Sequence, residues 1–157
     1  MPDTASLRFA VTSALLKAGR NWRRVASAAI GHHGISEACA LPLITVRRLG
    51  DGVRQVTVAD EIGLEGPSLV RLLDQLCAGG LIERRDDPND RRAKCLWLTR
   101  AGREVVEEME RELTALRVRV FRDVSDEDLA AVARVFDAID AAADPSRSAR
   151  ADAEDAA

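Results

Sequence analysis

Apolar side chains recur at helical spacing through most of the chain, and residues that cap or break helices divide them into segments. Two short segments stand close together, Thr57–Gly63 and Pro67–Ala78. In the first, we expect the Thr57 hydroxyl to cap the start of the helix and the Asp60 side chain to accept a hydrogen bond from the Thr57 N–H in return. Gly63 should end this helix in the left-handed conformation. In the second, the proline suits the first turn because its missing N–H would be unpaired there anyway. The pattern therefore predicts a helix-turn-helix.

The second of these helices has an apolar face and a polar face. Four leucines share the apolar face and should point into a core: Leu69, Leu72, Leu73 and Leu76. The opposite face carries Ser68, Arg71, Asp74 and Gln75. Because that face can contact a polar partner, this helix is the candidate recognition helix, and Gly79 should end it.

Alternating apolar and polar residues follow the second helix and predict two strands. The run Asp86–Asp90 between them favours a turn, and Leu96 and Leu98 should face inward on the returning strand. Trp97 should then point outward, toward a packing partner that the sequence leaves open. Five basic residues crowd around the turn: Arg84, Arg85, Arg91, Arg92 and Lys94. The sequence thus predicts a winged helix-turn-helix, in a mainly α fold with a small β-hairpin wing.

Several stretches of this region closely resemble the MarR family of transcriptional regulators, and its SlyA-like branch in particular. They are Pro67–Arg71, Leu73–Leu76, Gly80–Ile82 and Asp90–Lys94 followed by Leu98-Thr99. The resemblance covers roughly Trp22 to Arg103. It implies a sequence-specific DNA-binding regulator, with a repressor role expected, that binds a pseudo-palindromic operator as a homodimer.

The same resemblance implies which side chains contact DNA. Ser68 and Arg71 should contact base edges, and Arg92, with Arg91 nearby, should enter or flank the minor groove. The full set of expected DNA-binding residues is Pro67, Ser68, Arg71, Gln75, Arg91, Arg92 and Lys94. The alternative is a winged helix that serves as a protein-interaction module without specific DNA binding; the basic wing and Arg71 argue against it.

Long amphipathic segments lie on both sides of the winged helix. The first helix is expected over about Ser6 to Ala29, with two seam columns, Val11, Ala18 and Val25 beside Leu15, Trp22 and Ala29. Ser36 should cap a second helix that reaches Leu49 and either begins late or bends at Pro42. Gln55-Val56 should add a short strand to the wing sheet.

After the wing, Thr99 should cap a long helix with apolar positions at Val106, Met109, Leu113, Leu116 and Val120. Ser125–Asp128 forms a capping box for a last helix, carried by Leu129, Val132, Val135, Phe136 and Ile139. These apolar stripes predict a homodimer. We therefore expect a helical dimerisation region in residues 1–34 and 100–143, a DNA-binding lobe in 35–99 and a disordered acidic tail in 144–157.

Composition sets further limits on this interpretation. The chain has 157 residues and a formal net charge of −3, but basic residues outnumber acidic ones around the wing, and acidic residues outnumber basic ones from Asp140 to the end. Local charge governs contact with phosphates, so the mean does not exclude DNA. Three unevenly spaced cysteines indicate a reducing compartment, and we expect Cys39, Cys77 and Cys95 to be small hydrophobic residues rather than redox sensors. No membrane-spanning run or signal peptide is evident, so a cytoplasmic protein is expected.

Other chemistry has weak support in the sequence. No catalytic constellation, phosphate-binding loop or cofactor motif is present, so no enzyme and no cofactor are expected. His32, His33, Glu37 and Cys39 match no standard metal spacing, so no metal site is expected. Arg20, Trp22 and Arg23 on the first helix form a candidate ligand site. The family resemblance suggests a small aromatic carboxylate as the effector, whereas the arginines could instead pair with acids or phosphates.

Overall fold

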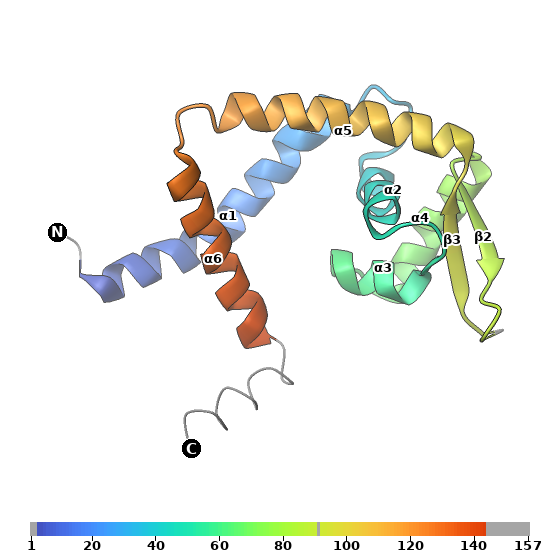
Figure 1. Cartoon of the computed structure of the whole chain (residues 1–157), viewed down its shortest axis with the longest axis horizontal. Coiled ribbons are helices and arrows are strands. Elements are labelled where there is room, and N and C mark those ends of the chain that lie inside the picture. The colour runs from blue at the N-terminus through green and yellow to red at the C-terminus, as the bar shows by residue number, and fades with distance from the viewer. Residues whose placement is uncertain (1–2, 91, 144–157) are drawn as a thin grey trace, which may run out of the picture. The chain divides into compact units, whose positions relative to one another are not determined.

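The computed structural model describes residues 3–90 and 92–143, so the expected tail at 144–157 lies outside the described residues. The chain divides after Leu116 into two compact units. The elements, labelled in Figure 1, are α1 (Thr4–Ile30), α2 (Glu37–Leu49), β1 (Val53–Arg54), α3 (Gln55–Ile62), α4 (Gly66–Ala78), β2 (Ile82–Asp86), β3 (Lys94–Leu98), α5 (Arg100–Val120) and α6 (Asp126–Ala143). The predicted winged helix, mainly helical with a small sheet, is confirmed.

Strands β1, β3 and β2 form one antiparallel sheet in that order. β2 pairs with β3 along the hairpin, with Arg84 opposite Leu96, and β1 pairs on the other side, with Val53 opposite Leu96. The expected third strand exists, but it was placed wrongly at Gln55-Val56, which belong to α3. Pairing with β3 fixes the strand two residues earlier, and no local sequence signal marks that long-range contact.

The helix-turn-helix follows its local signals closely, with one correction. α3 begins at Gln55 with Arg54 at the N-cap, so the expected cap at Thr57 is wrong and this threonine lies inside the helix. Gly63 ends α3 in the left-handed conformation, with φ of 66°, as predicted. In α4, Pro67 lies in the first turn and Gly79 is the C-cap, both as predicted.

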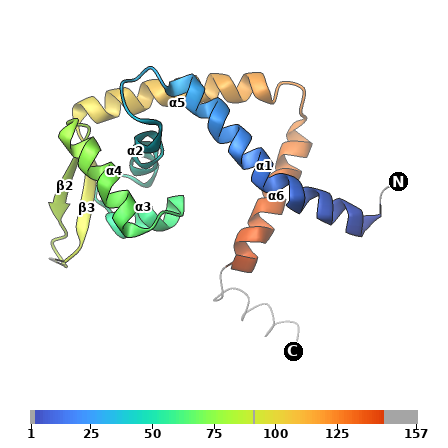
Figure 2. The same ribbon diagram turned by 180° about the vertical axis from the view of Figure 1, so that it is seen from behind.

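The core of the lobe lies between α2, α3, α4 and the inner face of the sheet, which Figures 1 and 2 show side by side from opposite directions. Its fully buried side chains include Leu43, Val58, Leu69, Leu73 and Leu96. α2 begins directly after Ser36 and continues through Pro42, so the late start considered for this helix is excluded. Ser36 occupies the N-cap position, but its side chain makes no capping hydrogen bond, so the expected cap is wrong. The lobe thus holds α4 and the hairpin on a single packed core.

A second apolar cluster joins the end of α1, the start of α2 and the middle of α5. Its buried members are Ile30, Ala40, Met109, Leu113 and Leu116, with Trp22 and Ala29 packed at the edge. The seam column of Leu15, Trp22 and Ala29 is half-buried, whereas Val11, Ala18 and Val25 are exposed in the chain. α1 therefore contacts α5 through its C-terminal part.

The start of α5 is held against the end of α4 by a dense set of contacts. The Thr99 hydroxyl accepts from the Gly102 N–H at 2.9 Å, so the predicted cap is confirmed, and it donates to the Gly80 carbonyl at 2.7 Å. The Thr99 N–H donates to the Leu81 carbonyl at 3.1 Å. Gly102 is buried so tightly that a Cβ there would stand 2.0 Å from the same carbonyl oxygen.

The second unit contains the end of α5 and helix α6. The Asp128 N–H donates to the Ser125 hydroxyl at 3.1 Å, and that hydroxyl donates to the Asp128 carboxylate at 2.7 Å, which confirms the helix start. No residue of α6 is buried within the described chain. Val120, one of the expected apolar positions of α5, is 46% exposed, as is Phe136, and Val132 is 48% exposed.

Candidate nucleic-acid interface

The outward face of α4 is polar and open, as the sequence predicts. Pro67, Ser68, Arg71 and Gln75 are all exposed. Arg71 makes no ion pair with any residue that the structure describes, so its guanidinium is available to a partner. Gln75 is partly engaged, because the Cys39 thiol donates to its side-chain oxygen at 3.3 Å. The four candidate residues on α4 therefore share one accessible surface.

The basic residues of the wing are not equivalent. Arg84 donates to Asp74 of α4 at 2.9 Å, Arg85 pairs with Glu83 at 2.6 Å, and Lys94 pairs with Asp86. Arg92 has no ion-pair partner within residues 3–90 and 92–143, whereas Arg91 lies outside the described residues. The sequence could not show these local neutralisations. They leave Arg92 as the described wing cation whose charge is most open to DNA.

The loop between β2 and β3 is fastened at its base by a buried carboxylate. Asp87 accepts from the Asn89 N–H at 2.8 Å and from the Arg54 Nε at 2.7 Å, while its side chain is 6% exposed. The Asn89 hydrogen bond, together with Arg54, outweighs the opposing effect of burial and holds the pKa of the Asp87 carboxyl below its ordinary value. Sequence analysis did not single out either residue of this ion pair, which links β1 to the wing loop.

Trp97 packs on the outer face of the wing sheet. The Arg85 guanidinium lies 4.8 Å from its ring centroid, and the ring edge passes close to Gly52, where an added Cβ would stand 3.3 Å from it. The partner that the sequence left open is therefore an arginine of β2 and the turn before β1, and not a neighbouring helix. This cation–π stack holds the Arg85 guanidinium against Trp97 on the outer face of the sheet.

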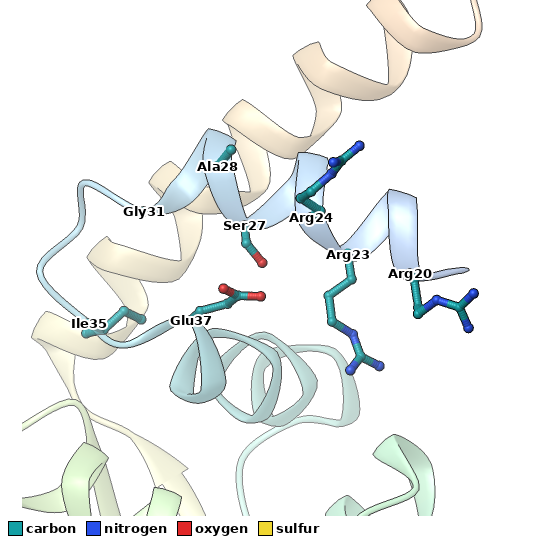
Figure 3. Close-up of a pocket in the computed structure, with 8 residues that line it drawn as sticks. All are labelled: Arg20, Arg23, Arg24, Ser27, Ala28, Gly31, Ile35 and Glu37. Atoms are coloured by element: carbon teal, nitrogen blue, oxygen red, sulfur yellow. The ribbon is translucent and has the colours of Figure 1, made fainter. Parts of the chain in front are cut away.

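A cavity of about 510 Å³ lies between α1 and α2. Its lining is Arg20, Arg23, Arg24, Ser27, Ala28, Gly31, Ile35 and Glu37. Figure 3 shows Arg23 extending toward α2 and the Ser27 hydroxyl facing the Glu37 carboxylate. Of the candidate ligand residues, Arg20 and Arg23 line this cavity, whereas Trp22 packs against the second apolar cluster.

The histidines and cysteines do not group in the structure as their spacing in the sequence suggested. His32 and His33 lie with Glu112 of α5, and not with Glu37 or Cys39. Cys39 and Cys95 are buried and Cys77 is half-buried. Burial raises the pKa of the Cys77 and Cys95 thiols above the ordinary value, which opposes thiolate formation. No helix in the described part of the chain is both long and apolar enough to cross a membrane.

The fold and its exposed face define a class of protein, a winged helix-turn-helix regulator. The model of the MarR family matches residues 33–93. The structure of the transcriptional regulator PA3341 is 31% identical and aligns over 83% of this chain and 96% of that one, with a TM-score of 0.77. The chain belongs to the MarR family and is a DNA-binding transcriptional regulator rather than an enzyme.

Two further solved structures are similar to the chain. CouR from Rhodococcus jostii RHA1, bound to p-coumaroyl-CoA, is 27% identical over 86% of this chain and 92% of that one, with a TM-score of 0.73. A mutant MarR from E. coli, in complex with operator DNA, is 18% identical over 88% of this chain and 99% of that one, also with a TM-score of 0.73. The second likeness concerns the fold alone.

Proposed function

We propose that the protein represses transcription by binding a pseudo-palindromic operator as a homodimer, and that a small aromatic acid releases it. The observation that carries the DNA-binding part is the open cation pair formed by Arg71 on α4 and Arg92 on the wing, neither neutralised by a described acid. The Asp90–Lys94 and Leu98-Thr99 motifs support placing the chain in the SlyA-like branch.

In this proposal α4 enters the major groove. Ser68 and Arg71, near its N-terminal end, contact base edges, while Pro67 and Gln75 border the contact. An arginine in this position can bind guanine through two hydrogen bonds, which contributes about 1–3 kcal/mol of discrimination. Arg71 therefore provides specificity.

The wing contributes mainly charge and groove shape. Arg92 enters or flanks the minor groove, with Arg91 beside it, and Lys94 contacts phosphate after exchanging its Asp86 partner. A phosphate contact carries no base information, so the wing strengthens binding to many sequences equally. Arg92 therefore provides affinity.

Dimerisation is supported by apolar surface that the single chain leaves uncovered. α1 exposes Leu7, Phe9 and Leu16, and α6 exposes Val132 and Phe136. Large exposed apolar patches favour association, and a two-fold dimer would present two α4 helices to successive major grooves about 34 Å apart. Residues 1–34 and 100–143 would form the dimerisation region and residues 35–99 the DNA-binding lobe.

The α1–α2 cavity supports the effector part of the proposal. Arg20 and Arg23 can pair with a carboxylate, and no described acid forms an ion pair with either of them. CouR, a relative of similar fold, is bound to an aromatic acyl thioester. An effector releases DNA only to the extent that it binds the DNA-free conformation of the protein more tightly than the DNA-bound one. A coupling free energy of about 1–3 kcal/mol between the two sites is typical.

The test is a mobility shift on genomic fragments over a series of salt concentrations, followed by the variants Arg71→Ala and Arg92→Ala. Arg92→Ala should weaken operator and random DNA alike and reduce the salt slope by about one ion. Arg71→Ala should reduce the preference for operator by about 1–3 kcal/mol. Arg122→Ala is the matched control, because this exposed arginine already pairs with Asp123 at 3.1 Å.

The outcomes separate the parts of the proposal. Equal losses on operator and random DNA would reduce Arg71 to a phosphate contact, and an unchanged salt slope would remove Arg92 from the interface. If no fragment bound with a salt-dependent preference, a protein-interaction role for the winged helix would replace specific DNA binding.

A further inference from the structure

The loop after α1 places both histidines of the chain against one glutamate of α5. His32 Nε2 lies 3.0 Å from Glu112 Oε1, and His33 Nε2 lies 3.1 Å from Glu112 Oε2. These are the two histidines of the whole sequence, and Glu112 lies 79 positions after His33. Each imidazole therefore directs its outer nitrogen at a different oxygen of the same carboxylate.

This arrangement brings together three atoms that bind transition metals. One ligand atom from each of His32, His33 and Glu112 lies within 4.8 Å of the others. Zinc binds imidazole nitrogen and carboxylate oxygen at about 2.0–2.2 Å, so ligand atoms of one ion lie no more than about 4 Å apart. Small side-chain rotations are enough to close the remaining difference.

The neighbour of His33 indicates which nitrogen is free to bind a metal. The His33 side chain is 6% exposed, and its Nδ1 lies 3.7 Å from the carboxylate of Glu108, one helical turn before Glu112. A neutral ring with its proton on Nε2 would turn the Nδ1 lone pair toward that carboxylate. A ring that binds a metal through Nε2 instead directs Nδ1–H at Glu108, the usual support for a metal-bound histidine.

The alternative is that the two imidazoles donate hydrogen bonds from Nε2–H to Glu112 without a metal. Both ring nitrogens then meet one carboxylate, with the ring centroids 4.3 Å apart. A zinc titration separates the two arrangements. A single divalent ion balances the two carboxylates without charging either ring, and Glu108 also has Arg111 at 3.8 Å, which suits a supporting role.

We propose that His32, His33 and Glu112 bind a divalent transition-metal ion of the zinc class, with Glu108 orienting His33. Two imidazoles and a carboxylate leave room for water as a fourth ligand, and the His32 side chain, 64% exposed, leaves the site open to solvent. The sequence alone predicted no metal site, because the third ligand comes from a distant helix.

The site would also act on the α1–α2 cavity. Gly31 and Ile35, on either side of the histidine pair, line that cavity. A bound ion would fasten the loop between them to α5 and restrict the shapes that the cavity can adopt. Metal binding can be measured without operator or effector, so its test uses protein alone and does not depend on the proposed function.

The experiment is a zinc titration of chelator-treated protein by competition with a chromogenic chelator, with Co²⁺ absorption as a second measurement. We expect one ion per chain. Glu112→Gln and His33→Ala should each weaken binding by at least about 100-fold, and Glu108→Gln by about 10-fold. Glu110→Gln, which removes the same charge from the same helix, should bind zinc like the wild type.

Several controls make the result decisive. Circular dichroism checks folding, and if the buried His33→Ala variant is unfolded, the exposed His32→Ala variant serves in its place. A cobalt spectrum without a thiolate charge-transfer band excludes binding through Cys77. Absence of micromolar zinc binding, or equal binding by wild type and Glu112→Gln, would overturn the proposal.

Discussion

Replacing Gly102 by alanine should destabilise the protein although it improves the helix propensity of α5. An alanine inside a helix is favoured over glycine by about 1 kcal/mol, which alone predicts a more stable variant. At this position, however, the added Cβ would stand 2.0 Å from the Leu81 carbonyl oxygen, where real contacts stay above 3.0 Å. The helix or the strand entrance must therefore move by about 1 Å or more.

The size of the loss follows from the bonds that this movement breaks. Forcing a methyl group into a packed site costs about 1–3 kcal/mol. The Thr99 N–H bond to Leu81 and the Thr99 hydroxyl bond to Gly80 lie at the same junction and contribute about 1 kcal/mol each. After the propensity gain is subtracted, the free energy of unfolding should fall by about 2–4 kcal/mol.

Urea unfolding followed by far-ultraviolet circular dichroism measures this difference at a fixed protein concentration. Gly19→Ala is the matched control, because this α1 glycine has nothing within 4 Å of an added Cβ. It should raise the free energy of unfolding by up to about 1 kcal/mol. A Gly102→Ala protein as stable as the wild type would refute the packing argument.

Three further predictions test other parts of the structure. Asp87→Asn should lower the free energy of unfolding at neutral pH. Because the pKa of Asp87 is lowered in the folded state, the stability difference from the wild type should be complete above about pH 4 and shrink below it. A difference that does not change with pH in urea titrations would contradict this. Ending the chain before Val120 should give monomers or aggregates by light scattering, and a truncated chain that stays a soluble dimer would refute dimerisation through the terminal helices. In an operator-release assay with a panel of aromatic acids, Arg20→Ala and Arg23→Ala should respond less than wild type and Lys17→Ala should respond normally; equal responses would place the pocket elsewhere.

The sequence predicted the features that are decided within a few residues. Pro67, Gly63 and Gly79 delimit α3 and α4 because their backbone preferences act locally, and alternation placed Leu96 inside the sheet. Thr99 was predictable as a cap for the same reason.

The missed features depend on contacts between distant segments. The start of α3 is fixed by pairing of Val53–Arg54 with β3, which outweighs the capping preference of Thr57. The ion pair of Arg54 with Asp87 and the meeting of His33 with Glu112 likewise join residues 33 and 79 positions apart. No periodicity or motif shows such pairs, so the sequence could predict helix α4 and its polar face but not which wing charges remain available.

The position of β1 in the sheet has a consequence for how the protein is made. β1 follows α2 in the chain and is synthesised well before β3, its partner in the sheet. Because Val53 pairs with Leu96, the helix-turn-helix lies wholly inside the loop that this pairing closes. Contacts of high sequence separation form late because the loop entropy must be lost before they stabilise anything. On a growing chain, α4 is complete before the strand that locks its lobe has left the ribosome. The lobe of the nascent protein should therefore become stably folded only after Leu98 emerges from the ribosome.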